Sequence, residues 1–577
     1  MSHSLKRLLA GVLMAAIIAT ASVSSAGAVT SWSSTATRAT KLVSATDLGR
    51  LAPSTPLHLA IGLALRNPAG LRALIRAVDT PGSSQYERFL SHSQYMARFA
   101  PTARAVAALT RYLAAQGFRH IAVAGDRLYV SADATAAQAS RAFHTTLQRY
   151  AQRGEVVYAN STPAQVPAAL AHTVLSVLGL NDIPGFQFPH QIKPLTSTGC
   201  GLLSYGLCSF NPQGFRDAYH AAGGTGAATA IAIMAEGDLT QVVKDLRTAE
   251  KAFGEPQVPY TIVHTGLASP DTSGADEWDL DTQYSSGMAS TLSQLYIYDA
   301  TTLTDSDIGL EFNRWVSDDK AKAASASFGE CDVLPYADGF MLTNDEAMNV
   351  AAAQGQTMHA SSGDTGGQSC AVAPTNGVPS PDGGVNYPCS SPYVVCVGGT
   401  TLFSNPPVND YSREIGWTDG GGGISALESS PYWQKCVVPS NGGSNLQRGV
   451  PDIAMDADPN TGAVVYVDGA PLIVGGTSLS SPLALGSWAI METAAGNHLG
   501  FASPLLYRLY PTTGCVNGVP VPQTSQLGTP TNDPSYPLHD IVLGTNVAYP
   551  NTPGWDYVTG LGTYDVAAVS RAVSAEK

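Results

Sequence analysis

A run of glycine, threonine and serine, Gly475-Gly476-Thr477-Ser478, joins two apolar segments of different pattern. Residues 463–474 before it are strand-like, and residues 483–495 after it are helix-like. Glycines allow a tight turn that leaves room for a bound molecule. A serine at such a turn lies near a helix N-terminus, where backbone N–H groups favour a negative charge. The run therefore predicts a strand–turn–helix unit, which is either a plain turn before a helix or a site for a nucleophile and its oxyanion.

The size and charge of the chain limit its class. It has 577 residues, which is more than one domain usually holds, and 44% of them are hydrophobic. Charged residues make up 13%, about half the usual share, and the net charge is −14. A mildly acidic, charge-poor protein is a poor binder of nucleic acid. Few charges also limit self-repulsion in acid, which is consistent with an acid-exposed protein.

The N-terminus has the pattern of an export signal, which we assign to residues 1–28. Lys6 and Arg7 precede an apolar stretch, residues 8–21, and Ala26-Gly27-Ala28 supplies the small residues of a cleavage site. No later segment reaches the apolar length of a membrane span. We therefore expect a secreted protein, extracellular or periplasmic, that has no membrane contact after signal removal.

The cysteines support export. There are eight, and none precedes residue 200: Cys200, Cys208, Cys331, Cys370, Cys389, Cys396, Cys436 and Cys515. An even number in an exported chain favours disulfides. Proximity in sequence predicts Cys200/Cys208 and Cys370/Cys389 as local pairs. The sequence has no CxxC pair or HExxH motif that would indicate zinc.

Composition also divides the chain. Residues 46–182 are cysteine-free and alternate strand-like with helix-like segments, as a small α+β domain does. Residues 183–206 contain prolines and no hydrophobic period, so we interpret them as a linker that is easily cut. From residue 207 to 577, short strands alternate with helices, which predicts a parallel sheet covered on both faces. The expected strands of this part are 228–235, 294–298, 323–328, 357–361 and 393–397.

Two further segments carry acidic groups. On a helix, Glu277 and Asp281 are i and i+4 neighbours on one face, which is unfavourable unless they share a proton or face a site. A solvated acidic helix is the other interpretation. Asp364 follows a helix and a strand in a Ser-Gly-Asp turn, which places it at the carboxyl edge of the sheet, where ligands bind. A plain Asp-Gly turn is its alternative.

Together with the serine turn, these segments resemble the sedolisin family of serine-carboxyl peptidases over nearly the whole chain. The family's E-x-x-x-D pattern is met by Glu277 and Asp281, its S-G-D-x-G by residues 362–366, and its G-T-S-x-x-x-P by residues 476–482. Residues 421–425 and 448–452 are supporting matches.

The resemblance implies an architecture of two domains. The catalytic domain, residues 207–577, would have a subtilisin-like α/β fold with a parallel seven-stranded sheet. An activation prodomain of the α+β, ferredoxin-like kind, residues 46–182, would precede it and act as an intramolecular inhibitor. The linker, residues 183–206, would be the processing region.

The resemblance also implies roles for four residues. Ser478 would be the nucleophile, Glu277 its general base and then acid, Asp281 the group behind Glu277, and Asp364 the oxyanion partner. The chemistry is coherent, because a serine needs an adjacent base whose pKa is near the working pH. Histidine, with a pKa of about 6.5, is protonated at pH ~4, whereas glutamate at about 4.3 is suitably poised. A protonated Asp364 can donate to the oxyanion.

A Ser-His-Asp peptidase is the natural competitor and needs a histidine near the sheet edge. The candidates are His264 and His359, and neither lies in the His-Gly-Thr context that subtilisins use. His359 falls inside a predicted strand, so we expect it to be a packed residue.

A further segment near the C-terminus offers hard oxygen ligands, as calcium requires. The resemblance implies one Ca²⁺ held by the side chains of Asp540 and Asp556 and the carbonyls of Ile541, Thr552 and Gly554. The family usually has glycine where Thr552 stands, a change that a carbonyl ligand tolerates. Without the resemblance, the segment is a loop with two solvated aspartates.

One position departs from the family pattern. Related enzymes often have tryptophan where Phe328 stands, and phenylalanine has no side-chain N–H. Glu236 matches a glutamate that assists the acid network in some members, and Phe328 leaves that network in doubt.

These observations predict an exported, monomeric acid endopeptidase that is made as a zymogen and acts on proteins and peptides. It would cut itself in the linker on acidification, when protonated carboxylates would loosen the prodomain. Two alternatives stay open: a tripeptidyl-peptidase of the same family, and an inactive calcium-binding protein on a peptidase scaffold.

Overall fold

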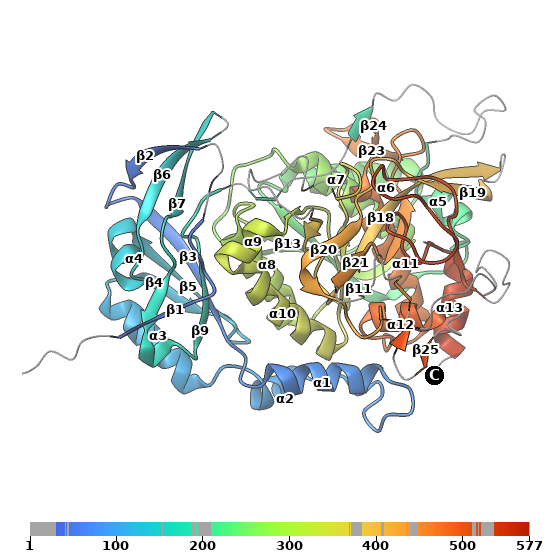
Figure 1. Cartoon of the computed structure of the whole chain (residues 1–577). Helices are drawn as coiled ribbons and strands as arrows, with labels where there is room; N and C mark the ends of the chain where they lie inside the picture. Colours follow the sequence, from blue (N-terminus) through green and yellow to red (C-terminus); the bar gives the residue numbers. More distant parts are fainter. Residues whose placement is uncertain are drawn as a thin grey trace, which may run out of the picture.

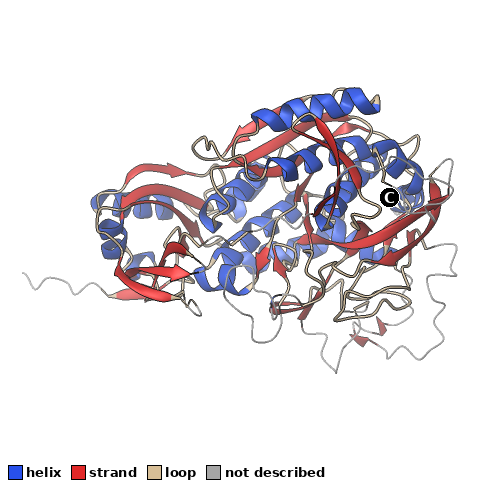
Figure 2. Cartoon of the chain, turned by 90° about the horizontal axis from the view of Figure 1, so that it is seen from above, coloured by secondary structure: helices blue, strands red, loops and turns tan. Residues whose placement is uncertain are grey.

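The computed structural model describes residues 31–40, 42, 45–152, 154–183, 185–186, 191–193, 209–368, 370, 384–405, 409–435, 437–438, 447–510, 515–516, 519–520 and 536–575. Within these ranges a smaller N-terminal unit, blue to cyan in Figure 1, lies beside a larger unit built around one sheet. Figure 2 shows the two units from above. Among the described residues, no helix combines the length and apolar character that a membrane crossing requires. The predicted signal, residues 1–28, lies outside them.

A four-stranded antiparallel sheet of order β4-β5-β3-β9 forms the centre of the N-terminal unit. Its strands are β3 (Pro56–Leu63), β4 (Arg119–Val123), β5 (Tyr129–Thr135) and β9 (Val174–Leu178). Helix α3 (Ala103–Ala115) precedes β4, and α4 (Ala136–Ala142) follows β5. This is the β-α-β-β-α-β order of a ferredoxin-like fold. The expected α+β architecture is therefore confirmed.

Local capping signals place these two helices. The Thr102 hydroxyl accepts a hydrogen bond from the backbone of Ala105, and Thr135 and Gln138 form a capping box. Helix α3 then buries one apolar face, whose members are Val106, Leu109 and Leu113. The remaining elements of this unit are β1 (Trp32–Ser34), β2 (Thr46–Arg50), β6 (Leu147–Gln152), β7 (Glu155–Asn160), β8 (Gln165–Pro167) and η1 (Ala168–Leu170).

Two helices of the N-terminal unit extend beneath the larger one: α1 (Pro68–Asp79) and α2 (His92–Arg98) (Figure 1). Asn67 caps α1 by accepting from the Gly70 N–H at 3.0 Å, as its position before Pro68 predicts. At the far end of α1, Arg508 of the larger unit donates to the Asp79 carbonyl at 2.8 Å. The N-terminal unit is therefore attached along much of the larger one.

The larger unit contains, in its described residues, an eight-stranded sheet whose main order is β12-β13-β11-β14-β16-β18-β19, with β22 also paired to β18. All neighbours are parallel except β18 and β19, which leaves seven parallel strands. This matches the seven-stranded parallel sheet that we expected. The strands are β11 (Gly226–Glu236), β12 (Tyr260–His264), β13 (Leu292–Ala300), β14 (Ala323–Ala326), β16 (Thr357–Ser361), β18 (Val394–Asn405), β19 (Asp410–Gly416) and β22 (Ile453–Asp456).

Helices pack on this sheet in two groups. The first is α6 (Thr240–Phe253), α7 (Ala275–Met288) and α11 (Thr477–Ala494), with α7 contacting both others. The second is α8 (Asp305–Asp318) and α10 (Phe340–Gln354), which lie between the sheet and the N-terminal unit (Figure 1). Both Asp364, after β16, and Ser478, on α11, belong to segments at this sheet.

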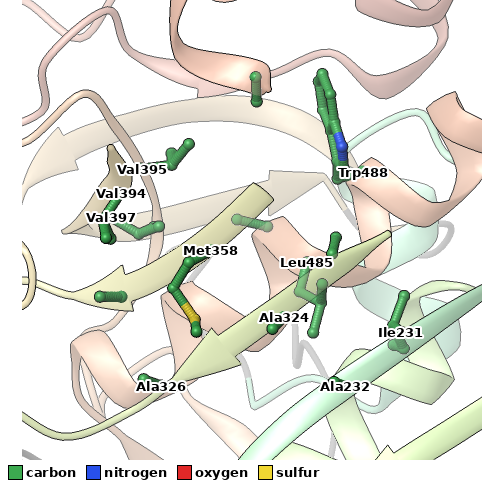
Figure 3. Close-up of a cluster of buried hydrophobic side chains, with 14 of the residues drawn as sticks. Ile231, Ala232, Ala324, Ala326, Met358, Val394, Val395, Val397, Leu485 and Trp488 are labelled. Atoms are coloured by element: carbon green, nitrogen blue, oxygen red, sulfur yellow. The ribbon is translucent and has the colours of Figure 1, made fainter. Parts of the chain in front are cut away.

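The core joins α11 to the sheet (Figure 3). Leu485 and Trp488 of α11 lie on the face of the sheet that carries Ile231 of β11 and Val395 of β18, and all four are fully buried. Burying a side chain of this size contributes about 1.5–3 kcal/mol. Continuous apolar strands are expected of a parallel sheet covered on both faces. The packing fixes the position of α11 and, with it, the residues at its N-terminus.

The apolar residues 463–474 form two strands, not one: β23 (Ala463–Val467) and β24 (Ala470–Gly475). Between them Asp468 and Gly469 have φ angles of 50° and 77°. A two-residue type I′ turn requires this pair of left-handed conformations, and Asp-Gly is a strong signal for it. The hairpin brings the end of β24 directly to Ser478.

The other elements of the larger unit are short. They are α5 (Pro212–Ala218), β15 (Glu330–Cys331), α9 (Val333–Asp338), β17 (Asn386–Tyr387), β20 (Gly423–Ser429), β21 (Gln447–Val450), α12 (Ala502–Leu509), β25 (Cys515–Val516), β26 (Val519–Pro520), β27 (Leu538–His539), β28 (Thr563–Tyr564) and α13 (Val566–Ala575).

Two disulfides are present in the described residues, and they correct one predicted pair. Cys370 is bonded to Cys331, and Cys389 to Cys396, with Cα–Cα distances of 5.6 and 4.6 Å. The expected Cys370/Cys389 pair is therefore wrong. Strand β15, which carries Cys331, pairs with β17, and this contact brings a cysteine distant in sequence close to Cys370. The predicted Cys200/Cys208 pair lies outside the described residues.

Candidate active site

The two acidic residues of α7 lie inside the protein. Glu277 and Asp281 are one helical turn apart, and both side chains are 0% exposed. A solvated acidic helix, the alternative interpretation, is excluded by this burial. Charged groups are rarely buried without a partner or a function, because their desolvation is costly.

Ser327, which follows β14, connects α7 to α11. Its hydroxyl donates to Asp281 Oδ1 at 2.6 Å, and its carbonyl accepts a hydrogen bond from Ser478 Oγ at 3.3 Å. We did not predict a role for Ser327. The signal was its place at the end of a predicted strand, where side chains of neighbouring strands meet.

Ser478 is the second residue of α11 and is 0% exposed. Gly476 just before it has φ of 128°, a conformation that side chains rarely adopt. A Cβ at Gly475 would lie 2.5 Å from the backbone nitrogen of Pro459. Both glycines are therefore needed for the close turn that the sequence predicted. The helix starts at Thr477, earlier than the expected residue 483.

Asp364 is bound to the start of the same helix. Its Oδ1 accepts hydrogen bonds from the backbone N–H and the hydroxyl of Thr477, both at 2.8 Å. Thr477 Oγ1 in turn accepts from the Gly363 N–H at 2.9 Å. The loop after β16 and the N-terminus of α11 are thus fixed to each other. The three predicted segments, far apart in sequence, come together at one place.

Part of the predicted linker lies beside this place. Strand β10 (Gln191–Lys193) pairs antiparallel with β24, Gln191 opposite Gly475 and Lys193 opposite Ile473. Lys193 Nζ also donates to Asn460 Oδ1 at 2.7 Å. The linker therefore contains an ordered strand next to the segment that leads into Ser478.

A buried aromatic and acidic group borders α7. Trp278 donates from Nε1 to the Glu236 carbonyl at 2.7 Å, and its ring meets Phe328 edge-on with centroids 6.0 Å apart. Burial raises the pKa of the Glu236 carboxyl to about 7, and the nearby Asp271 and Asp299 add to the effect. Phe328, the departure from the family pattern, is fully buried and acts as an apolar wall here.

The histidine candidates occupy other roles. His359 is fully buried in β16 with Nδ1 3.3 Å from the Ala324 carbonyl, and burial lowers its pKa to about 4. The prediction that it is a packed residue is confirmed. His264 ends β12 and binds Asp299 through Nδ1 at 2.5 Å.

The predicted calcium ligands lie in one loop region between β27 and β28. The Gly554 N–H lies 3.1 Å from both carboxylate oxygens of Asp540, and the Thr552 N–H donates to Asp556 Oδ2 at 2.8 Å. The Ile541 carbonyl accepts from Asn551 Nδ2, which also donates to Asp556. Burial raises the pKa of Asp556 to about 6. All five residues are therefore close together, although they span 17 positions of the chain (540 to 556).

Comparison with known proteins agrees with the fold. The family described as "Pro-kumamolisin, activation domain" matches residues 44–183. Sedolisin of Pseudomonas sp. (strain 101) is 36% identical over 587 aligned residues, 96% of this chain and 94% of that protein. Xanthomonalisin of Xanthomonas sp. (strain T-22) is 33% identical over 573 residues, 90% of this chain and 66% of that protein.

A solved structure of a sedolisin is also similar to this chain. Pseudomonas sedolisin, a serine-carboxyl proteinase complexed with two molecules of pseudo-iodotyrostatin, matches with a TM-score of 0.55 and 33% identity, covering 64% of this chain and 98% of that chain. The fold and these similarities together define a serine-type peptidase of the serine-carboxyl class. The chain belongs to the sedolisin family, and it carries the family's activation domain ahead of its subtilisin-like peptidase domain.

Proposed function

We propose that this chain is the precursor of an exported endopeptidase that works in acid and uses Ser478 as its nucleophile. Glu277 acts as general base and then as general acid, Asp281 supports Glu277, and Asp364 binds the oxyanion. The observation that carries the proposal is the hydrogen-bonded junction of α7, α11 and the loop after β16, made through Ser327 and Thr477.

The reaction follows from these positions. Ser478 Oγ attacks the carbonyl carbon of the substrate while Glu277 accepts the hydroxyl proton. The carbonyl oxygen becomes an oxyanion, and a protonated Asp364 donates a hydrogen bond to it. Glu277 then gives its proton to the leaving amine. Water, activated by the same carboxylate, releases the second product from the acyl-enzyme.

Acid pH is a requirement of this residue set. Asp364 can donate only as a neutral carboxylic acid, a form that is lost as pH rises above its pKa. Glu277 and Asp281 share one helix face inside the protein, so they titrate as a coupled pair. One proton held between them at pH ~4 leaves a base that still accepts the serine proton.

The precursor is held inactive by its own N-terminal segments. Strand β10 of the linker pairs with β24. Phe186, near the start of the linker, packs edge-on against Phe328, with the ring centroids 5.3 Å apart. These two contacts support a linker whose described residues cover the peptidase domain near Ser478. Cleavage within residues 183–206 would release the covering segment and open the site.

One Ca²⁺ in the loop between β27 and β28 would stabilise the peptidase domain. Two aspartates and three backbone carbonyls are the hard oxygen donors that calcium prefers, and the loop places all five residues together. Asp540 and Asp556 would supply the side-chain ligands, with Ile541, Thr552 and Gly554 supplying carbonyls. A cation there would also offset the buried charge of Asp556.

Export is supported by the signal pattern of residues 1–28 and by the two disulfides, which form in oxidising compartments. We expect the processed enzyme to act as a monomer on proteins and peptides. Whether it releases tripeptides or cuts internally is decided by the products of a peptide-library digest.

A casein assay at pH ~4 tests the mechanism. We expect Ser478→Ala and Glu277→Gln each to reduce activity at least about 1,000-fold, because each removes a group that takes part in bond making. Ser487→Ala is the matched control on the same helix, since among the described residues its hydroxyl donates only to the Leu483 carbonyl. Full activity of either active-site variant would disprove the assigned roles, and an inactive parent would favour the calcium-binding alternative.

A further inference from the structure

A cluster of metal-binding side chains lies outside the catalytic and calcium residues. His220 follows α5, His539 ends β27, and Asp565 immediately precedes α13. One ligand atom from each residue lies within 4.8 Å of those of the other two. All three residues are partly buried, so the cluster is neither sealed in the core nor fully solvated.

The contacts of Asp565 and His220 orient their side chains. Asp565 Oδ1 caps α13 by accepting from the Ala568 N–H at 2.8 Å, and Oδ2 lies 2.9 Å from His220 Nδ1. His220 Nε2 lies 3.4 Å from Asp410 Oδ1 on β19. One carboxylate oxygen is thus committed to the helix, and the other faces the histidine.

His539 is held differently. Its ring stacks on Tyr411 with centroids 3.8 Å apart and an interplanar angle of 8°. Its centroid lies 6.0 Å from that of His220. Within the described part of the chain, His539 Nε2 is a buried polar atom that has no hydrogen-bond partner. A buried nitrogen without a partner is unfavourable, and a ligand to this atom would remove that cost.

We propose that His220, His539 and Asp565 form a second metal site, one that binds Zn²⁺. Two imidazole nitrogens and one carboxylate oxygen are a donor set that zinc accepts in tetrahedral geometry, with water completing the coordination. Calcium takes oxygen ligands, so this cluster differs in kind from the loop that holds Asp540 and Asp556. No short zinc motif marks these residues, because they are 319 and 26 positions apart in the sequence (220 to 539 and 539 to 565).

The role of this ion is structural. Among the described elements of the peptidase domain, it links the first helix, α5, to the last, α13, and to β27 beside the proposed calcium loop. These segments lie near the two ends of the described peptidase domain in sequence. A bond between them reduces local opening at both ends, where fraying normally starts.

The test uses untagged Ser478→Ala precursor, which cannot digest itself, with saturating Ca²⁺ at pH ~7, where imidazole is largely neutral. Zinc titration by calorimetry should show one ion per chain. Thermal melting should shift upward by several degrees at a Zn²⁺ concentration about 100 times Kd. Co²⁺ in place of Zn²⁺ should give the strong visible absorption of a four-coordinate site.

Three variants separate this site from other sources of zinc binding. His220→Gln and His539→Gln should each weaken zinc binding by more than about 100-fold, because each removes a direct ligand. His498→Gln, an exposed histidine elsewhere, should bind zinc like the parent. Asp540→Asn should keep the zinc response while losing the calcium response.

The proposal fails if the parent shows neither a calorimetric nor a melting response to Zn²⁺, or if its Co²⁺ spectrum is that of the hydrated ion. It also fails if His539→Gln retains the parent's affinity, since the ion would then be bound elsewhere. The parent measurements decide the question even if a ligand variant does not fold.

Discussion

Gln191 of the linker pairs with Gly475, the last residue of β24 and three positions before Ser478. In the precursor, a segment of the linker is thus paired with the strand edge next to the proposed nucleophile. Peptide substrates commonly bind proteases and other receptors by adding a strand to such an edge. The zymogen and its substrates would therefore compete for the same backbone groups.

Replacing Lys193 with proline tests this pairing. Lys193 lies opposite Ile473, whose backbone groups face β10 because those of the next residue, Val474, pair with Ala463 of β23. Proline lacks an N–H and is excluded from paired strands. We expect amide exchange in β24 of the Ser478→Ala precursor to increase about five- to tenfold, the effect of losing about 1 kcal/mol of hydrogen bonding. Lys193→Ala keeps the N–H and is the matched control for the lost side chain. Equal exchange in both variants would mean that the backbone of β10 does not protect β24.

Ser327→Ala tests the link between α7 and α11. The variant loses the donor to Asp281, a bond to a charged group that contributes about 1.5–3 kcal/mol, so kcat/KM should fall about 10- to 150-fold. The acid limb of the pH profile should move to higher pH, because a carboxylate that loses a donor holds its proton more tightly. Ser327→Thr should recover most of the activity.

Ser325→Ala is the control for this experiment. Ser325 lies on β14, two residues before Ser327, is equally buried, and hydrogen-bonds the Ser481 hydroxyl at 2.7 Å. It should leave the pH profile unchanged. If both alanine variants shift the profile alike, Ser327 acts through general packing.

The pH dependence of prodomain binding should follow Asp79. Burial raises the pKa of this carboxyl to about 7, although Arg508 and Tyr432 of the peptidase domain oppose the shift. In the separated prodomain the residue would ionise at about 3.9. Binding of prodomain to processed enzyme therefore takes up a proton between these values, and affinity should fall by up to about tenfold per pH unit as pH rises from about 4 to about 7.

Prodomain affinity that falls as pH rises is opposite to the expectation that protonated carboxylates loosen the prodomain in acid. In acid, Asp79 strengthens the contact, so release depends on cleavage. Inhibition constants of prodomain added in trans at several pH values measure the slope. Asp79→Asn should flatten the slope, and an unchanged slope would show that other groups control it.

Calcium removal should destabilise the peptidase domain. A ligand present at about 100 times Kd stabilises the folded state by about 2.7 kcal/mol, so a chelator should lower Tm by several degrees. Added Mg²⁺ should not restore it, because magnesium requires smaller octahedral geometry. Asp556→Asn should melt at the same low temperature with and without calcium. Chelator-insensitive melting of the parent would contradict the calcium site.

Some elements could be predicted closely from the sequence. The strand at residues 357–361 has the expected bounds, and the helix that carries Glu277 and Asp281 is present. Neither shows alternating exposure, since every residue of the strand and residues 277–288 of the helix are buried. The motif residues converge because β16 ends where α11 begins, and Asp364 bonds Thr477 there.

Features that depend on tertiary contacts could not be predicted. The apolar flanks of Asp468-Gly469 predict one strand, whereas the structure has a hairpin there. Ser327 matters through partners 46 and 151 positions away, and a single sequence does not show them. The Cys331–Cys370 bond likewise follows from strand pairing, not from proximity along the chain.

The Cys331–Cys370 bond has a consequence for where the enzyme can mature. It ties the segment that follows Ser327 to the loop that follows Asp364, so it spans two parts of the candidate catalytic site. Such bonds persist only in oxidising surroundings. A chain that folds among reduced thiols would hold this loop by non-covalent contacts alone. Disulfide formation would thus restrict maturation of the peptidase to oxidising compartments, independently of pH.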